Sequence, residues 1–452
     1  MSVYPRNLSA FLNRLSGYNK NNVKMNVLGS SDAAHGDTIQ VDLPTNSIVD
    51  LSSLAWSFDL TWSATGTNGK KHHFPINAES VINRLTVEVN GQTLVNLSNY
   101  NVLWHALLYA SATDDYQRQR MVAQANSQTG ASNGTSLEVA STAAVPAQSE
   151  TRSHVVDAWV GFLGSAKPNF IDTSLLGNVR ITLTLASNNM IGGDDAASTQ
   201  SFSIANQAFS IDVCSISDGI YDSMLDQMLA SGAPIEVPFK SYFSYSSSNN
   251  TMDQTTNFNV ASQSIDRLWA LARATDGSGA GAAGFDSPAA VHLTTAPAHA
   301  IVTKNPAFFN YETCNGMNYH FQVNNTLYPQ WQSTQPQDWW QHLKLAVGDQ
   351  GNMLSGSYPN ALSHYLDNFF VFACSLEHHT DGDERFVSGI DTRGASASCY
   401  FKSNQGTNTT DPNTGGAAVR NRTGAIKNQI MVFAECTSSL KIYANKVLEV
   451  VQ

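Results

Sequence analysis

A hairpin followed by a helix occurs twice in this chain, and this repeat constrains the fold more than any other feature of the sequence. In the first copy, residues 85–89 alternate apolar and polar side chains, as a half-buried strand does. Asn90 and Gly91 then supply a tight turn, and the chain returns through residues 93–94. Residues 101–107 follow with apolar side chains at helical spacing.

The second copy has the same order of parts. Residues 319–323 alternate, Asn324 and Asn325 make the turn, residues 326–327 return, and residues 338–343 begin a helix. It starts 234 residues after the first copy, close to half of the 452-residue length. Two similar domains in tandem explain this spacing. The alternative is coincidence, because strand, Asn-rich turn and aromatic helix are common parts.

Strand patterns dominate both halves of the chain, and three long stretches between them are rich in small and polar residues. These stretches, residues 125–152, 275–300 and 403–422, are typical of surface loops. The sequence therefore predicts an all-β protein, with two tandem eight-stranded jelly-roll β-sandwiches, a few short helices and long surface loops.

A chain of this length exceeds what one hydrophobic core normally supports, so we expect a division into parts. The expected parts are a basic N-terminal arm with a short amphipathic helix at 1–31, a first jelly roll at 32–215, a linker helix at 216–234 and a second jelly roll at 235–452.

The N-terminal arm is the sharpest electrostatic feature of the sequence. Its 31 residues contain four basic and no acidic side chains, on a chain whose net charge is −11. Four apolar side chains fall at the spacing of one helical face. We expect the arm to be an interface that docks under a neighbour, onto an inner membrane or toward packaged nucleic acid; packing on its own domain is the alternative. The predicted interface residues are Arg6, Leu8, Phe11, Leu12, Arg14, Leu15, Lys20 and Lys24.

Composition limits the classes of function. Charged residues make up only 13% of the chain, against about 25% in an average soluble protein. Uncharged polar surface is cheaper to desolvate, which favours flanks covered by neighbouring subunits, although a secreted lectin or a salt-adapted fibre would share this composition. The acidic balance argues against sequence-specific nucleic-acid binding by the whole chain.

The five cysteines are widely spaced, without a C-x-x-C pair, and indicate reduced core thiols in a protein assembled in a reducing compartment, cytoplasm or nucleus. No signal-peptide core and no apolar run of membrane-spanning length is visible.

No motif in the sequence predicts catalysis, a cofactor or a metal site. Residues 279–284 match the dinucleotide fingerprint, but Pro288 stops the helix that such a site needs. Residues 377–384 gather acidic and His side chains without complete calcium or zinc spacing, so we expect an exposed turn without metal. His72 and His73 are interpreted as part of a loop, and the Trp residues of the repeated helices as packing groups.

Several short phrases resemble the double-jelly-roll major capsid proteins of tailless icosahedral DNA viruses, most of all the polinton-like virus and virophage branch. These phrases are residues 43–51, residues 73–75 with 82–91, the turn at 389–393 and the closing segment 437–442.

The resemblance implies a structural, non-enzymatic protein of the virion. It implies a homotrimer in which six jelly rolls give a pseudo-hexagonal outline that tiles a facet. The implied partners are the protein itself, neighbouring trimers, penton and minor capsid proteins, and an inner membrane or packaged DNA contacted through the arm. The alternatives are a tandem jelly-roll carbohydrate-binding or fibre module, or a glycan-active enzyme, which would need calcium loops, exposed aromatic residues or a carboxylate pair in a cleft.

Overall fold

The computed structural model describes the β-sheets, the helices and part of the connections between them. The described residues are 18–65, 71–75, 77–111, 136–138, 148–193, 199–216, 219–230, 232, 234–248, 251, 253–273, 318–333, 335–347, 365, 370–377, 389–394, 399–404, 429–444 and 447–452.

The first half of the chain forms a sandwich of two sheets with a small third sheet beside them. One sheet has the order β1-β13-β4-β10, with β2 and β9 attached, the second has the order β3-β11-β6-β7, and the small sheet has the order β12-β5-β8. The strands are β1 (Tyr18–Met25), β2 (Ala33–Ala34), β3 (Thr38–Asp42), β4 (Ile48–Thr65), β5 (Lys71–His73), β6 (Ile82–Val89), β7 (Gln92–Ser98), β8 (Ser136–Glu138), β9 (Gln148–Val156), β10 (Phe170–Asp172), β11 (Val179–Leu185), β12 (Gly192–Gly193) and β13 (Thr199–Ile216). The helices are η1 (Ala78–Val81), α2 (Tyr100–Ser111), α4 (Phe162–Ser165), α5 (Thr173–Leu176) and η2 (Asn188–Met190).

The second half forms another sandwich, reached through α6 (Gly219–Ala230). Its sheets have the orders β14-β21-β16-β19, with β22 attached, and β15-β20-β17-β18. The strands are β14 (Ile235–Ser248), β15 (Asp253–Phe258), β16 (Ile265–Arg273), β17 (Asn318–Val323), β18 (Thr326–Ser333), β19 (Phe372–Ser375), β20 (Cys399–Asn404), β21 (Gln429–Ile442) and β22 (Leu448–Val451); α8 (Pro336–Val347) follows β18.

The two sandwiches have the same strand order, which identifies the counterpart of each strand. Taken in chain order, β1, β3, β4, β6, β7, β10, β11 and β13 correspond to β14, β15, β16, β17, β18, β19, β20 and β21, and both sets make the same two four-stranded arrangements. Helices α2 and α8 also correspond, since each follows the repeated hairpin. This is the predicted fold class, two eight-stranded jelly rolls in tandem.

The repeated hairpins form where the sequence predicts them. Strands β6 and β7 pair around Asn90 and Gly91, whose φ angles of 47° and 80° lie in the left-handed region that this tight turn requires. Strands β17 and β18 pair in the same way around Asn324, with φ of 56°. Asn and Gly tolerate this backbone region, so both turns are fixed by local sequence.

Three expectations about local structure are wrong. Residues 18–25, expected in the arm, form β1, which pairs along its whole length with β13. The expected loop 125–152 contains β8 and the start of β9. His72 and His73 lie in β5, which pairs with β8 and β12, and not in a loop. Each strand has too few apolar side chains to show periodicity, and backbone pairing with a neighbour places it in a sheet.

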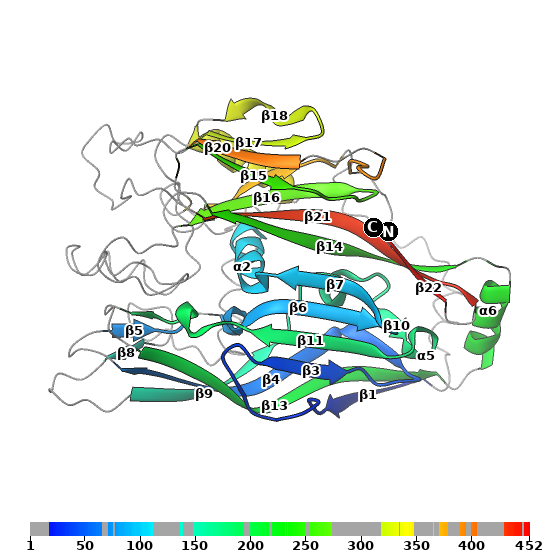
Figure 1. Ribbon diagram of the computed structural model, residues 1–452. Helices are drawn as coiled ribbons and strands as arrows, with labels where there is room; N and C mark the ends of the chain where they lie inside the picture. Colours follow the sequence, from blue (N-terminus) through cyan, green and yellow to red (C-terminus); the bar gives the residue numbers. More distant parts are fainter. Residues whose placement is uncertain are drawn as a thin grey trace, which may run out of the picture.

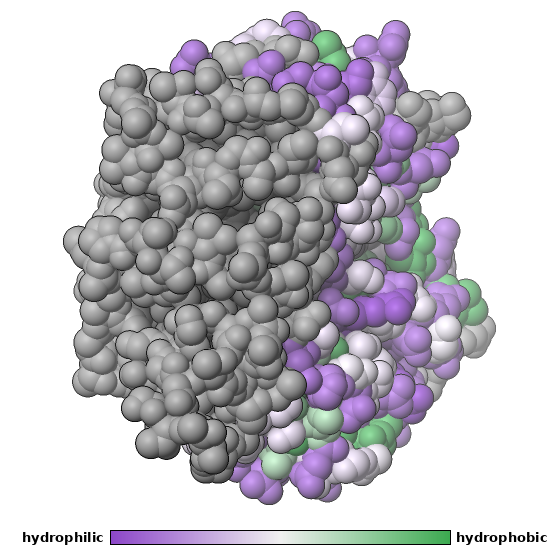
Figure 2. Space-filling view, turned by 60° about the vertical axis from the view of Figure 1, so that its left-hand side comes forward, coloured by the Kyte–Doolittle hydropathy of each residue, from purple (hydrophilic) through white to green (hydrophobic). Residues whose placement is uncertain are grey.

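The two sandwiches meet through β7 and α4 of the first and β14 of the second, and helix α2 lies between them (Figure 1). Phe162 packs edge-on against Phe239 with ring centroids 5.2 Å apart, and the amide of Lys167 donates to the carbonyl of Pro238. None of the described helices is both long and apolar enough to cross a bilayer. On the face shown in Figure 2, the described residues are mostly hydrophilic, with hydrophobic ones in small separate patches.

Candidate functional site

The part of the chain that the structure describes contains no group of three or more His, Cys, Asp or Glu side chains placed to hold a metal ion. Residues 279–284 and 378–384 lie outside the described residues. Glu377, expected in an exposed turn, is instead half-buried, with 9% of its side chain accessible. It belongs to a charge network that the sequence analysis did not identify.

The tryptophans of the repeated helices pack inside the protein. Trp104 is 4% exposed and donates its indole N–H to the carbonyl of Ala158. Trp339 is 2% exposed and meets Tyr319 edge-on at 5.1 Å. The interpretation of these residues as packing groups agrees with their burial.

Most of the predicted arm interface lies outside the described residues, namely Arg6, Leu8, Phe11, Leu12, Arg14 and Leu15. Lys20 and Lys24 are exposed residues of β1. The ammonium of Lys20 lies 3.1 Å from Asp50 and 2.9 Å from Asp212. Hydrogen bonds to these two carboxylates raise the pKa of Lys20.

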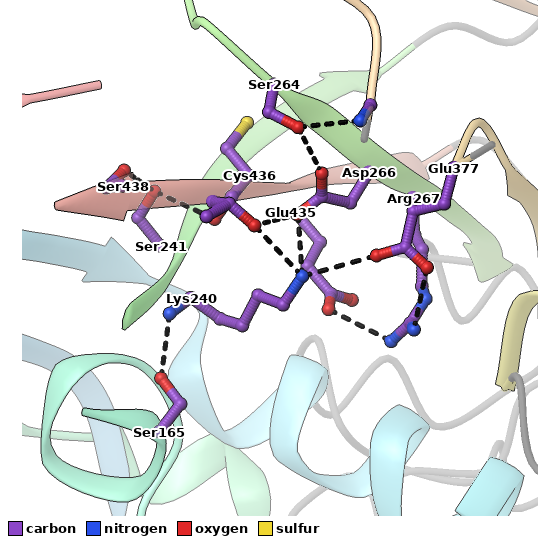
Figure 3. A network of polar contacts seen from close by, with 12 residues as sticks. Ser165, Lys240, Ser241, Ser264, Asp266, Arg267, Glu377, Glu435, Cys436 and Ser438 are labelled. Carbon is purple, nitrogen blue, oxygen red and sulfur yellow. Dashed lines mark hydrogen bonds and ion pairs between the residues drawn. The ribbon is translucent and has the colours of Figure 1, made fainter. Parts of the chain in front are cut away.

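A second lysine stands at the centre of the buried charge network (Figure 3). Nζ of Lys240 donates to Oδ2 of Asp266 at 2.7 Å, to Oγ1 of Thr437 at 3.1 Å and to Oε1 of Glu377 at 3.3 Å. Only 13% of the Lys240 side chain and 1% of the Asp266 side chain are exposed. Burial opposes the charge of the lysine, but attraction to Asp266, Glu435 and Glu377 outweighs it and raises the pKa of Lys240.

Arg267 connects the remaining carboxylates. Its guanidinium donates to Glu377 and to Glu435, each at 3.1 Å, and the indole of Trp269 donates to Glu435 at 3.0 Å. Burial raises the pKa of Glu435, and attraction to Arg267 and Lys240 together with the Trp269 hydrogen bond offsets only part of that effect. These contacts place an opposite charge beside each buried charge. Without such a partner, burying a charge costs free energy.

The turn at 389–393 anchors this network. The amide of Gly389 donates to Oγ of Ser264 at 2.8 Å, and that hydroxyl donates to Asp266 at 2.5 Å. A Cβ at position 389 would lie 2.3 Å from the carbonyl oxygen of Ile265, so only glycine fits. The turn thereby holds Asp266 in position for Lys240.

The network lies on the face of the second sandwich that the first sandwich covers. Phe372 of β19 stacks on Phe321 of the opposing sheet, so its side chain points into the second sandwich. Successive side chains along a strand point to opposite faces, so the alternate residues of β19 and of the strands paired with it point outward. On that outward face, Ser244 accepts a hydrogen bond from Asn99 of the first sandwich at 3.3 Å. Ser165 of α4 accepts from the backbone amide of Lys240 at 2.8 Å. The charges are therefore buried at the junction between the two halves.

The two lysine clusters occupy corresponding strands. Lys20 is on β1, Asp50 on β4 and Asp212 on β13, while Lys240, Asp266 and Glu435 are on the counterparts β14, β16 and β21. In the first cluster Asn22 pairs with Asp212, and Lys20 lies two residues before Asn22. In the second cluster Tyr242 pairs with Glu435, and Lys240 lies two residues before Tyr242. The lysine differs in exposure, 38% for Lys20 and 13% for Lys240. The repeat depends on which strands pair, so no spacing in the sequence shows it.

Four of the five cysteines are buried thiols, namely Cys214, Cys374, Cys399 and Cys436; Cys314 lies outside the described residues. Burial raises the pKa of the Cys436 thiol to about 12 and raises that of Cys374. Protonated, buried thiols act as small apolar core groups.

Comparison with known proteins gives full-length matches to solved structures. No protein-family profile and no curated protein sequence matches the chain. VP54 of PBCV-1, from a crystal structure fitted into a reconstruction of the virophage Sputnik, matches with a TM-score of 0.58 and 13% identity, over 100% of this chain and 99% of that one. The PBCV-1 virus capsid matches at 0.56 and 14% identity with the same coverage. The Faustovirus major capsid protein matches at 0.55 and 10% identity, over 94% of this chain and 90% of that one.

At these identities the likeness concerns the fold, and it extends over both sandwiches. The chain therefore has the double-jelly-roll fold of viral major capsid proteins.

Proposed function

We propose that this protein is the major capsid protein of a tailless icosahedral DNA virus. The observation that carries the proposal is the end-to-end match, in which both jelly rolls and nearly the whole length of the chain correspond to VP54 of PBCV-1. A fold shared along its whole length leaves little of the chain for an added catalytic domain. Function is nevertheless argued from surfaces and sites, because a fold alone hosts many functions.

The proposed assembly is a homotrimer. Two similar sandwiches per chain and a threefold axis place six near-equal units in a ring, and such rings tile a flat facet. Penton and minor capsid proteins would complete the shell, and the arm before β1 would face an inner membrane or packaged DNA. Assembly in a reducing host compartment, cytoplasm or nucleus, is supported by the buried thiols of the described cysteines.

The second candidate function is carbohydrate binding. It is favoured by one observation: Trp331 on β18 has 53% of its surface exposed. Exposed tryptophan can stack on a sugar ring, but it is equally typical of protein interfaces.

Light scattering after size-exclusion chromatography separates the two candidates. A capsid protein should elute with three times the chain mass of 48.8 kDa, and electron microscopy of concentrated samples should show facets or closed shells. A monomer at all concentrations that binds glycans on an array would overturn the capsid proposal.

A further inference from the structure

The closest ion pair of the buried charge network joins Lys240 to Asp266 (Figure 3). Nζ lies 2.7 Å from Oδ2, and 13% of the lysine side chain and 1% of the aspartate side chain are exposed. Lys240 is on β14 and Asp266 is on β16, and β21 lies between these two strands, so the lysine side chain reaches across β21. An amine and a carboxyl group in contact are the two reactants of an amide bond.

The carboxyl group of Asp266 is held by hydroxyl donors on both of its oxygens. Oδ1 accepts from the hydroxyl of Ser264 at 2.5 Å, and Oδ2 accepts from the hydroxyl of Thr437 at 2.6 Å. Ser264 and Thr437 are at most 3% exposed, and the amide of Gly389 fixes Ser264 from behind at 2.8 Å. Fixed donors of this kind stabilise the negative charge that develops on a carboxyl oxygen when a nucleophile attacks the carbon.

Glu377 is placed to act as a base toward the lysine. Although burial opposes it, attraction to the surrounding carboxylates raises the pKa of Lys240, so the amine carries a proton at rest and needs a base before it can attack. Oε1 of Glu377 lies 3.3 Å from Nζ, and Oε2 accepts from Arg267 at 3.1 Å, which orients the carboxylate. A positioned carboxylate in hydrogen-bond reach of the proton is the arrangement of a general base.

We propose that Lys240 and Asp266 become joined after folding by an amide bond between Nζ and Cγ, with Glu377 as the base. Glu377 takes one proton from the ammonium, and the lone pair of Nζ forms the N–C bond. Thr437 accepts a hydrogen bond from Nζ at 3.1 Å and donates to Oδ2, so it can relay the second proton to Oδ2. The Cγ–Oδ2 bond then breaks, and Oδ2 leaves as water with this proton and the one that Glu377 returns.

The reaction is balanced without an oxidant, a reductant or another reactant, because an ammonium and a carboxylate become an amide and one water molecule. One buried cation and one buried anion disappear together, so the desolvation cost of both is removed and the net charge of the network does not change. The fold holds the two groups in contact, which gives them a high effective concentration. Until the bond forms, the ion pair balances the charges around it.

The bond would tie β14 to β16 across β21, on the sheet face that the first sandwich covers. The described cysteines are thiols, and an amide link is stable in a reducing compartment, where disulfides are rare. This inference goes beyond the proposed function and does not depend on it.

The Lys20 cluster provides an internal comparison on the corresponding strands. Nζ of Lys20 lies 3.1 Å from Asp50 and 2.9 Å from Asp212, but 38% of the lysine side chain and 21% of the Asp212 side chain are exposed. Water reaches these groups, so neither charge is destabilised by burial and nothing excludes the reverse hydrolysis. We expect this lysine to remain an unmodified amine.

Mass spectrometry of the denatured full chain tests the inference. We expect an intact mass lower than that of the sequence by one water molecule. After proteolysis, the peptide with Lys240 should be joined to the peptide with Asp266, whereas the peptides with Lys20, Asp50 and Asp212 should be separate. The sequence mass in the folded protein, or a link from Lys240 to Glu377, would overturn the inference and leave the capsid proposal untouched.

Three variants test the assigned roles, each checked for folding by circular dichroism. Lys240→Arg keeps the positive charge and should show no loss of water. Glu377→Gln keeps the size of the side chain and removes the base, so the loss of water, followed over time after cell-free synthesis, should slow by at least about 100-fold. Lys20→Arg is the matched control and should react as the unmodified chain does.

An unchanged rate in Glu377→Gln, or loss of water from Lys240→Arg, would contradict the mechanism. Glu377→Asp replaces the glutamine variant if that variant does not fold. It keeps the negative charge beside Arg267 but withdraws the carboxylate from Nζ, so the same slowing is expected, and an unchanged rate would again contradict the role of Glu377.

Discussion

Lys240 is the residue on which the charge balance between the two sandwiches depends. Its ammonium lies within 3.3 Å of two carboxylates, and both have less than a tenth of their side chains exposed. Buried ion pairs add little net stability compared with apolar residues, but removing one partner leaves charge without compensation. The positive charge of Lys240 is therefore needed to balance the buried carboxylates around it.

Replacing Lys240 with Met should lower the free energy of unfolding by about 3–5 kcal/mol, measured by urea denaturation. Lys441→Met is the matched control, because Lys441 forms a surface ion pair with Glu236, whose side chain is 52% exposed, and such pairs contribute little. Equal losses in the two variants would show that burial of the network does not matter.

The same variant should change the pH dependence of stability. The pKa of Glu435 is raised above its ordinary value of 4.5, so the folded protein keeps this proton to a higher pH than the unfolded chain does. The carboxyl therefore stabilises the fold most below pH 4.5, and this contribution falls as the pH rises through the folded pKa. Without Lys240 the pKa of Glu435 should rise further, so the stability of Lys240→Met should decline more steeply than that of the unmodified protein between pH 4.5 and neutrality. Parallel pH profiles would contradict this.

At the scale of elements, β1 divides the N-terminal arm into two parts. From Tyr18 onward the chain is a strand of the first sandwich, paired with β13. Only the segment before it, with Arg6, Arg14 and the predicted apolar stripe, is left for a separate assembly role.

Deleting residues 2–16 should leave soluble trimers and reduce the yield of closed shells, because the deletion spares β1 and the Lys20 cluster. The comparison variant lacks residues 2–25 and so loses β1. It should be destabilised, since the edge of β13 and the carboxylate of Asp212 lose their partners. Light scattering and electron microscopy measure both outcomes. Normal shells from the shorter deletion would show that the arm is dispensable, and loss of trimers would assign it to the trimer contact.

At the scale of the whole molecule, the junction joins the sandwiches through groups that neither half can satisfy alone. Phe162 packs on Phe239, and the backbone of β14 bonds to Ser165 and Lys167. Buried contacts of this kind couple the unfolding of the two units.

We therefore expect the protein to unfold in one calorimetric transition. Phe239→Ala should lower the stability of both sandwiches by about 3–5 kcal/mol in total, because the residue is fully buried at the junction. Two well-separated transitions in the parent protein would show that the halves are independent.

The sequence by itself determined the parts whose signal is local. Alternation in 85–89 and 319–323, with Asn and Gly in turns that need positive φ, predicted both hairpins. The repetition of the hairpin then predicted two similar domains. The structure supports the two-sandwich fold that followed from it.

Only the tertiary structure decided the features that depend on residues far apart in the chain. The segment 18–25 has almost no apolar alternation, and β13, nearly 200 residues later, makes it a strand. The charge network draws on Lys240, Asp266, Glu377 and Glu435, which no sequence spacing relates. Their burial follows from the packing of one sandwich on the other. Local propensity is encoded within a few residues, whereas the desolvation of a charge depends on everything that surrounds it after folding.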